Sequence, residues 1–219
     1  MVTKHLSIFE EELKALKLDK TVRGVALIGS VAYGTATEDS DLDIFVLGEK
    51  DKFVNKETEG ICVEIRYSKM ETAMKKLREN PMEVYKYIYS RIAYDDGGLA
   101  CLFGEARNIY DSYRTPEKEM ERIRYWLSST KKKLLSGIKN ADMQKVSYLL
   151  ATNTWKVLEG VWAINNKPIP PSSVAFSKRE LLNMPSENWF ENLLMGDIEF
   201  RAKTMLEVID IIRDNDILI

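Results

Sequence analysis

The sequence has few of the residues that build disulfide frameworks and zinc sites. Its 219 residues include only two cysteines and one histidine. The cysteines, Cys62 and Cys101, are far apart and form no Cys-x-x-Cys pair, so neither a disulfide scaffold nor a cysteine-rich zinc site is expected. This cysteine usage is typical of a protein in a reducing compartment.

A long apolar run and an excess of positive charge are also missing. Nowhere do 18 apolar residues run together, and residues 1–16 carry acidic residues inside their apolar pattern, unlike a signal peptide. Lys and Arg total 32 against 34 Asp and Glu, which gives a net charge of -2. A membrane and long nucleic-acid partners are therefore disfavoured, and we expect a cytoplasmic protein.

The first half of the chain combines helical and strand patterns. Hydrophobic residues make up 45% of the sequence, which is enough for a sizeable core. Apolar spacing predicts a helix over residues 3–18, and short apolar runs predict strands over 25–29, 42–48 and 61–67. The polar run over 49–60 is expected to be a hairpin-type connection between the last two strands.

A further helix is predicted after the last of these strands. Ser68 is expected to be its N-cap, with Glu71 as the capping-box partner. Residues 81–93 are expected to continue as helix, and residues 93–98 to form a turn or a short edge strand. From Leu99 onward the pattern favours no strand.

The second half is predicted to be entirely helical. Its apolar spacing indicates one helix from about residue 116, a second over 141–164 and a last one over about 197–213. The expected fold class is therefore α+β. A mixed sheet flanked by helices would form a domain of residues 1–105, and an all-α bundle would form a domain of residues 106–219.

Two carboxylates stand where the central predicted strand begins. Because side chains alternate along a strand, Asp41 and Asp43 point to the same side. Two such anions need a cation or solvent between them, and Mg2+ prefers carboxylate oxygens while leaving positions for water and substrate phosphates. Glu64, on the next predicted strand, could supply a third carboxylate. Three acids could hold two metal ions for an in-line displacement at phosphorus.

A small-residue turn precedes these acids. Gly29 and Ser30 end a strand and precede a short helix expected over 31–37, so backbone N–H groups and a hydroxyl are available to a phosphate. Ser40, in the turn that leads to the acids, is a further nucleotide-binding candidate. Arg66, on the same face as the strand acid, is another, although it could instead pair with an acid.

The complete pattern resembles the signature of the nucleotidyltransferase superfamily. Gly29-Ser30, ten further residues and Asp41-x-Asp43 are followed by Glu64 in a strand. The resemblance implies that the three acids hold Mg2+, with two ions expected, at the triphosphate of ATP or another NTP, and that the Gly-Ser pair contacts phosphate. In some antibiotic-modifying members the matching acid takes the proton from the attacking hydroxyl, so Glu64 could be ligand, base or both.

The helical half is similar, more loosely, to the substrate-side domain of the aminoglycoside nucleotidyltransferases. This resemblance implies transfer of a nucleoside monophosphate, AMP from ATP by family frequency, to a hydroxyl of a small acceptor such as an aminoglycoside or lincosamide, with release of pyrophosphate. Tyr33 departs from the pattern, because many members carry Arg there. Whether two chains form a homodimer is left open.

Other functions remain open from the sequence. AMP could be transferred to a protein, as antitoxin-type members do, or the fold could be a non-catalytic nucleotide-binding sensor. Retention of three mutually repelling acids argues against the sensor. The absence of a basic stripe argues against transfer to RNA. A fused helical RNase toxin would need an Arg-x4-6-His motif, and the only histidine, His5, lies in the first predicted helix.

Two features of the helical half have alternative interpretations. The lysine run 131–133 could offer charge to a triphosphate or form a solvated helix face. The tryptophans could line an acceptor pocket or belong to the core; they are Trp126, Trp155, Trp162 and Trp189.

Overall fold

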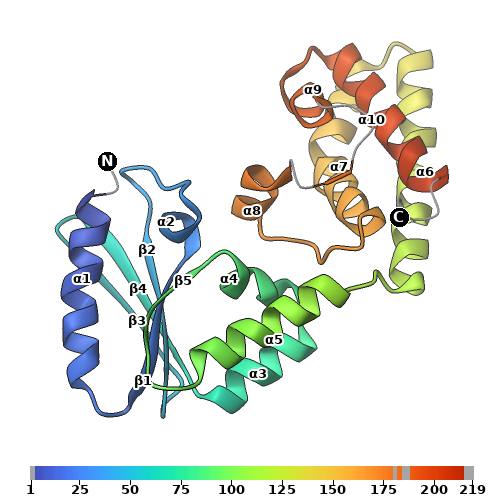
Figure 1. Cartoon of the computed structure of the whole chain (residues 1–219). Helices are drawn as coiled ribbons and strands as arrows, with labels where there is room; N and C mark the ends of the chain where they lie inside the picture. The colour runs from blue at the N-terminus through green and yellow to red at the C-terminus, as the bar shows by residue number, and fades with distance from the viewer. Residues whose placement is uncertain (1–2, 180–181, 184–187, 215–219) are drawn as a thin grey trace. The chain divides into compact units, whose positions relative to one another are not determined.

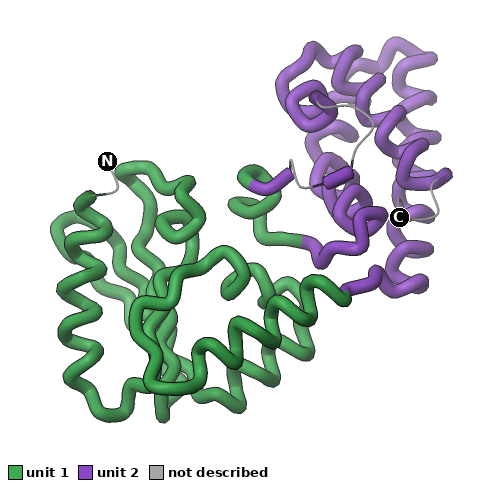
Figure 2. The backbone as a smooth tube through the Cα atoms, viewed as in Figure 1, with its two compact units in different colours: residues 1–112, 170–177 green, residues 113–169, 178–219 purple. Residues whose placement is uncertain are grey.

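The computed structural model describes residues 3–179, 182–183 and 188–214. The chain divides into two compact units, shown in green and purple in Figure 2. Unit 1 contains residues 1–112 and 170–177, and unit 2 contains residues 113–169 and 178–219. Within the described ranges, no helix combines the length and the apolar character needed to cross a lipid bilayer.

Unit 1 is built on a five-stranded mixed sheet with the strand order β3-β4-β2-β1-β5. The strands are β1 (Val22–Ile28), β2 (Leu42–Gly48), β3 (Lys52–Thr58), β4 (Ile61–Ser68) and β5 (Arg91–Asp95). Only the β2–β4 pair is parallel within the described sheet, and the other pairs are antiparallel. The expected α+β class, with a mixed sheet followed by helices, is confirmed.

Helices cover both faces of this sheet, as Figure 1 shows. Helix α1 (Thr3–Leu18) packs Ile8, Phe9 and Leu13 against one face. The other face is covered by α3 (Met70–Glu79) and α5 (Leu99–Ser112). Because β1 and β2 are buried on both faces, their sequences are nearly continuous apolar runs.

The connection expected over residues 49–60 contains a strand, β3, and the prediction was wrong there. Most β3 side chains are exposed, so the segment lacks the apolar alternation by which strands are identified. Strand β3 pairs antiparallel with β4. The two strands are connected by Glu59 and Gly60, whose φ angles are 53° and 78°. Positive φ at both central residues is the geometry of a tight two-residue hairpin turn.

The capping box expected at Ser68 is absent. Ser68 ends β4, and α3 begins at Met70 with Lys69 as its N-cap and no side-chain cap from its own sequence. Asp51, from the loop before β3, accepts hydrogen bonds from the Lys69 backbone N–H at 3.1 Å and the Thr72 hydroxyl at 3.0 Å. These contacts hold the pKa of the Asp51 carboxyl below its ordinary value, so its charge stabilises the helix start.

The helix expected over residues 81–93 is also only partly present. Short helical turns η1 (Pro81–Val84) and α4 (Tyr85–Ile88) are followed by β5. Strand β5 pairs with β1 at the edge of the sheet. The edge strand expected over 93–98 is therefore confirmed up to Asp95. Residues 91–93, expected as helix, are strand. The local pattern did not reveal this because the partner strand, β1, lies far away in the sequence.

Within its described residues, the regular secondary structure of unit 2 is entirely helical. The predicted helices are present as α6 (Glu117–Lys139), α7 (Met143–Ile164) and α10 (Ile198–Asp214), joined by the shorter α9 (Trp189–Met195). Helix α8 (Ser172–Ser177) belongs to unit 1, although the expected domain of residues 106–219 would include it. The expected domain boundary remains a prediction.

The tryptophans of unit 2 divide into two classes. Trp162 and Trp189 are buried in the helical core, in line with the core interpretation. Trp126 and Trp155 remain 53% and 39% exposed. Exposed indoles on a helix surface are less common than buried ones, so these two positions call for a separate explanation.

Candidate active site

The Gly-Ser turn joins β1 directly to a short helix, α2 (Gly29–Tyr33). The helix expected over 31–37 therefore begins two residues earlier and ends at Tyr33. It ends there because Gly34 takes φ 79°, a left-handed conformation that glycine adopts readily, and donates its N–H to the Ser30 carbonyl.

The sheet brings two of the predicted acids side by side. Asp43 lies opposite Ile28 in the antiparallel β1–β2 pair and opposite Glu64 in the parallel β2–β4 pair. Both carboxylates are half-buried, whereas Asp41, just before β2, is exposed. The pairing of β2 with β4 is what joins the strand acid to the Asp-x-Asp motif, from more than 20 residues away in the chain.

Gly29 makes room for one of these carboxylates. Its φ is 72°, and a Cβ built on it would lie 2.2 Å from Asp43 Oδ2 and 3.0 Å from Asp43 Cβ. Any side chain at this position would therefore both strain the backbone and displace the Asp43 carboxylate. Besides the phosphate contact that its motif suggests, Gly29 thus has a steric role that becomes visible only in the structure.

More negative than positive charges surround the Asp43 carboxyl. Burial raises the pKa of the Asp43 carboxyl, and the negative charges of Glu64 and Asp41 raise it further, while Arg66 acts in the opposite direction. Arg66 donates to Glu64 Oε2 at 2.6 Å. Arg66 thus pairs with an acid, and a nucleotide contact of Arg66 remains a prediction.

Cys62, which the sequence prediction left out, lies beside two of the acids. Ligand atoms of Asp41, Cys62 and Glu64 all lie within 4.8 Å of one another. The signal was present in the sequence, because Cys62 is two residues before Glu64 on the same face of β4. Its thiol points to Asn55 Oδ1 at 3.4 Å, and burial and the charge of Asp41 raise its pKa.

This donor set fits a hard divalent cation. Carboxylate oxygens are the ligands that Mg2+ prefers, and a neutral thiol is not. The raised pKa of Asp43 shows that its charge is poorly compensated by the protein alone, and a cation would relieve this. Asp41 and Glu64, from the cluster of ligand atoms, and Asp43, which lies opposite Glu64 in the sheet, are the carboxylates that could hold such an ion.

Ser30 faces a hollow within unit 1. The hollow has a volume of about 460 Å³, and its lining residues are Ser30, Thr35, Ser172, Ser173, Phe176 and Ser177. Most of these carry hydroxyl groups, which can donate to phosphate or sugar oxygens. Tyr33 lies on the same short helix, but its hydroxyl donates to the Tyr85 carbonyl, and burial and the charge of Asp43 raise its pKa to about 12.

Ser40 and His5 fix the loop that precedes Asp41. The Ser40 hydroxyl accepts a hydrogen bond from the Thr37 N–H at 2.8 Å and so closes the turn. His5 of α1 is 1% exposed, and its Nε2 lies 2.8 Å from the Ser40 carbonyl oxygen. Because a carbonyl oxygen only accepts, Nε2 carries the proton. A nucleotide contact of Ser40 remains a prediction.

We predict that His5 positions Asp41 through this hydrogen bond. Replacing His5 by Leu removes the donor and should raise the Mg2+ concentration needed for half-maximal activity about fivefold, the effect of roughly 1 kcal/mol of hydrogen bonding. His5→Gln keeps an amide N–H near the same place and should restore the wild-type Mg2+ dependence. Equal Mg2+ dependence in all three proteins, measured by pyrophosphate release, would show that His5 only supports the core.

The amino-terminal part of the chain matches a known family. Residues 6–94 match the sequence model of the nucleotidyltransferase domain family. The matched segment contains the Gly-Ser turn, both aspartates and Glu64, as the sequence resemblance had predicted. No curated protein matches the chain significantly.

Two solved structures align with most of the chain at low similarity. One is a nucleotidyltransferase-like protein from Exiguobacterium sibiricum 255-15, with a TM-score of 0.40 and 12% identity over 98% of this chain and 75% of that chain. The other is the spectinomycin adenyltransferase AAD(9) from Enterococcus faecialis with ATP and spectinomycin, with a TM-score of 0.32 and 11% identity over 95% of this chain and 99% of that chain. At these values no functional statement rests on either.

Proposed function

We propose that the chain, whose residues 6–94 match the nucleotidyltransferase domain family, transfers a nucleoside monophosphate from an NTP to a hydroxyl of a small molecule. ATP is the proposed donor, Mg2+ the proposed cofactor and pyrophosphate the second product. The observation that carries the proposal is the position of Asp43, which lies opposite Glu64 in the sheet and against Gly29, while ligand atoms of Glu64 and Asp41 lie within 4.8 Å of each other. Acidic groups beside a turn that offers backbone N–H groups suit a metal-bound triphosphate.

Each residue has a proposed task in this reaction. Asp41 and Asp43 would hold the metal, and Glu64 would join them or take the acceptor's proton. When bound, Mg2+ would neutralise charge on the phosphates and on the attacking and leaving oxygens. Gly29 and Ser30 would hold the triphosphate through backbone N–H groups and the hydroxyl, with the adjoining hydroxyl-lined hollow of about 460 Å³ receiving the rest of the nucleotide.

The proposed step is a single displacement at phosphorus. The acceptor oxygen forms a bond to the α-phosphorus while the bond from that phosphorus to the α,β-bridging oxygen breaks. The acceptor proton passes to Glu64 or to water, and the electron pair leaves with pyrophosphate. The Glu64–Arg66 ion pair supports this assignment, since it orients the Glu64 carboxylate within the site.

A small acceptor is proposed rather than a long polyanion. The net charge of -2 offers no excess of positive charge for nucleic acid. The looser resemblance of the helical half to the aminoglycoside nucleotidyltransferases favours an acceptor rich in hydroxyl groups, of the aminoglycoside or lincosamide kind.

The proposal is tested by incubating the purified chain with ATP, Mg2+ and a panel of acceptors, followed by mass spectrometry. We expect an adduct of one AMP on a small acceptor together with one pyrophosphate released, and neither product when Mg2+ is chelated. Label on a protein would instead identify an enzyme of the antitoxin type. ATP binding with neither product, across the whole panel, would favour a nucleotide sensor and contradict the proposal.

A further inference from the structure

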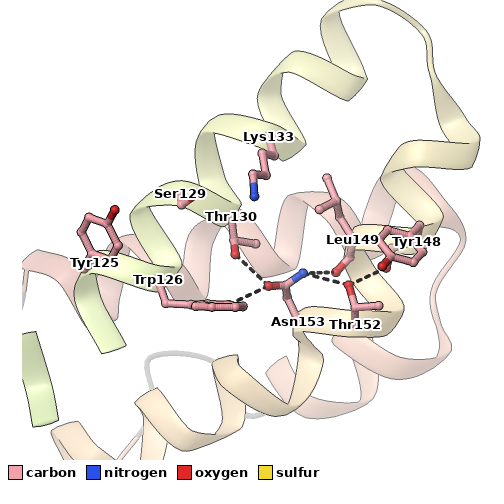
Figure 3. Close-up of a pocket in the computed structure, with 9 residues that line it drawn as sticks. All are labelled: Tyr125, Trp126, Ser129, Thr130, Lys133, Tyr148, Leu149, Thr152 and Asn153. Atoms are coloured by element: carbon pink, nitrogen blue, oxygen red, sulfur yellow. Dashed lines mark hydrogen bonds between the residues drawn. The ribbon is translucent and has the colours of Figure 1, made fainter. Parts of the chain in front are cut away.

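Helices α6 and α7 of unit 2 enclose a pocket that the proposed reaction does not use. Its volume is about 330 Å³, within the range of small-molecule sites. Figure 3 shows its nine lining residues: Tyr125, Trp126, Ser129, Thr130, Lys133, Tyr148, Leu149, Thr152 and Asn153. All of them come from two adjoining helices, so the pocket is built within one unit.

Three aromatic rings are presented to solvent around this pocket. Tyr125 is 80% exposed, Trp126 53% and Tyr148 68%. Within the part of the chain that the structure describes, none of these rings packs against another aromatic ring. Exposing aromatic rings of this size to water is unfavourable unless another molecule or side chain covers them.

The floor of the pocket is held by a buried polar residue. Asn153 is 6% exposed, and its Oδ1 accepts hydrogen bonds from Trp126 Nε1 at 2.9 Å and from the Thr130 hydroxyl at 2.8 Å. Its Nδ2 donates to the Leu149 carbonyl at 2.9 Å. Figure 3 draws these hydrogen bonds as dashed lines. They satisfy Asn153, and the bond from Nε1 restrains the plane of the Trp126 indole.

Lys133 is the only basic residue among those that line the pocket, and no acidic side chain pairs with it within the described ranges. The Lys133 side chain extends toward the space above the Trp126 ring in Figure 3. None of the lining residues is acidic. Lys131, two residues earlier, is by contrast paired with Asp210. The Ser129 hydroxyl adds a hydrogen-bond donor to the same pocket, whereas the Thr152 hydroxyl donates to the Tyr148 backbone carbonyl.

We propose that this pocket binds a small planar aromatic anion, a ring system that carries a carboxylate or phosphate group. The ring would stack on the fixed Trp126 indole between the two tyrosines, and the acidic group would pair with Lys133. The pocket volume of about 330 Å³ accommodates a bicyclic ring with one such group. The inference rests on the lining of this pocket and does not depend on the proposed reaction.

The test uses 2-naphthoate as the probe and 2-naphthalenemethanol as its uncharged counterpart. Titration into the 15N-labelled full chain should shift the indole N–H resonance of Trp126, which is assigned as the one missing from Trp126→Phe. Calorimetry should show that the neutral compound binds about 10-fold more weakly, the value of one charge-assisted hydrogen bond. Inorganic phosphate, which has no ring, should leave the indole resonance in place.

Two matched lysine variants test whether Lys133 is the residue that binds the carboxylate of the probe. Lys133→Met should weaken 2-naphthoate binding about 10-fold, whereas Lys132→Met, an exposed neighbour that does not line the pocket, should leave it unchanged. Equal affinity for the neutral compound, equal loss in both lysine variants, or no shift of the Trp126 resonance would overturn the proposal. Shifts of that resonance on protein dilution, without any probe, would instead identify the pocket as an interface between two copies of the chain.

Discussion

Replacing Asp43 by Asn is expected to abolish nucleotidyl transfer and, in the metal-free protein, to raise the melting temperature. Activity should fall by at least about 1000-fold, because a proposed metal ligand beside the phosphates is lost. The fold should gain stability because the Asp43 carboxylate is half-buried beside Glu64 and its pKa is raised. An amide of the same shape lacks the charge that this environment disfavours.

The effect of Asp43 on the stability of the fold depends on pH, because the pKa of its carboxyl is raised in the folded chain. A carboxyl with a raised pKa in the folded chain destabilises the fold wherever it is ionised, so the cost is present at neutral pH and disappears as the pH falls toward the ordinary value of 3.8. At pH 7 we expect Asp43→Asn to melt about 2–4 °C above the wild type, which for a chain of this length corresponds to roughly 1 kcal/mol. The difference should shrink in acid.

Calorimetric melting in the presence of a chelator, together with pyrophosphate release, measures both effects. Asp51→Asn is the matched control, because the pKa of Asp51 is lowered by the Lys69 N–H and that carboxylate therefore stabilises the fold. It should lower the melting temperature and leave the transfer rate unchanged. Substantial transfer by Asp43→Asn, or a lower melting temperature in that variant, would contradict the proposed role.

Gly29→Ala is expected to have the second large effect, a loss of transfer of about 100-fold with a marked loss of stability. The new Cβ would lie 2.2 Å from Asp43 Oδ2, so the carboxylate must move away from its place beside Glu64. A displacement of about 1 Å at a reacting site is enough to produce such a loss. The positive φ of 72° adds backbone strain of about 1–2 kcal/mol.

Gly34→Ala separates the steric effect from the strain. Gly34 has φ 79°, but a Cβ at this position meets nothing within 4 Å. It should therefore show the loss of stability that strain causes, about 1–2 kcal/mol, and keep a near-wild-type transfer rate. Initial rates at saturating ATP, compared with melting temperatures, distinguish the two variants. Equal rate losses in both would mean that Gly29 serves only the backbone conformation.

Much of the candidate site could be predicted from local sequence. The spacing from Gly29-Ser30 to Asp41-x-Asp43 places a turn and two acids around a buried strand, and the strand itself is unmistakable because β2 is apolar on both faces. The helix over Thr3–Leu18 and the long helices of unit 2 were equally clear, since each carries an apolar stripe at helical spacing. These features depend on residues close together in the chain.

The edge strands were the part of the sheet that local patterns missed or misassigned. β3 and most of β5 have exposed or half-buried side chains, so little apolar periodicity distinguishes them from loops or helix. They are strands because β4 and β1 offer backbone hydrogen-bonding partners, and that stabilisation is invisible in the segment itself. The same limit explains why Asp51, from another loop, replaced the expected capping box at Ser68.

Local sequence was enough to identify the residues that could bear the chemistry, because residue type and short spacings set charge, turn geometry and strand character. How these residues meet depends on the tertiary structure: Asp43 lies opposite Glu64, Gly29 leaves room for the Asp43 carboxylate, and Cys62 lies beside Asp41 and Glu64. The tertiary structure also packs α6 against α7, which places Lys133 and Tyr148 at one pocket. Each of these contacts joins segments through strand register or helix packing, which depend on the whole core rather than on neighbours in the chain.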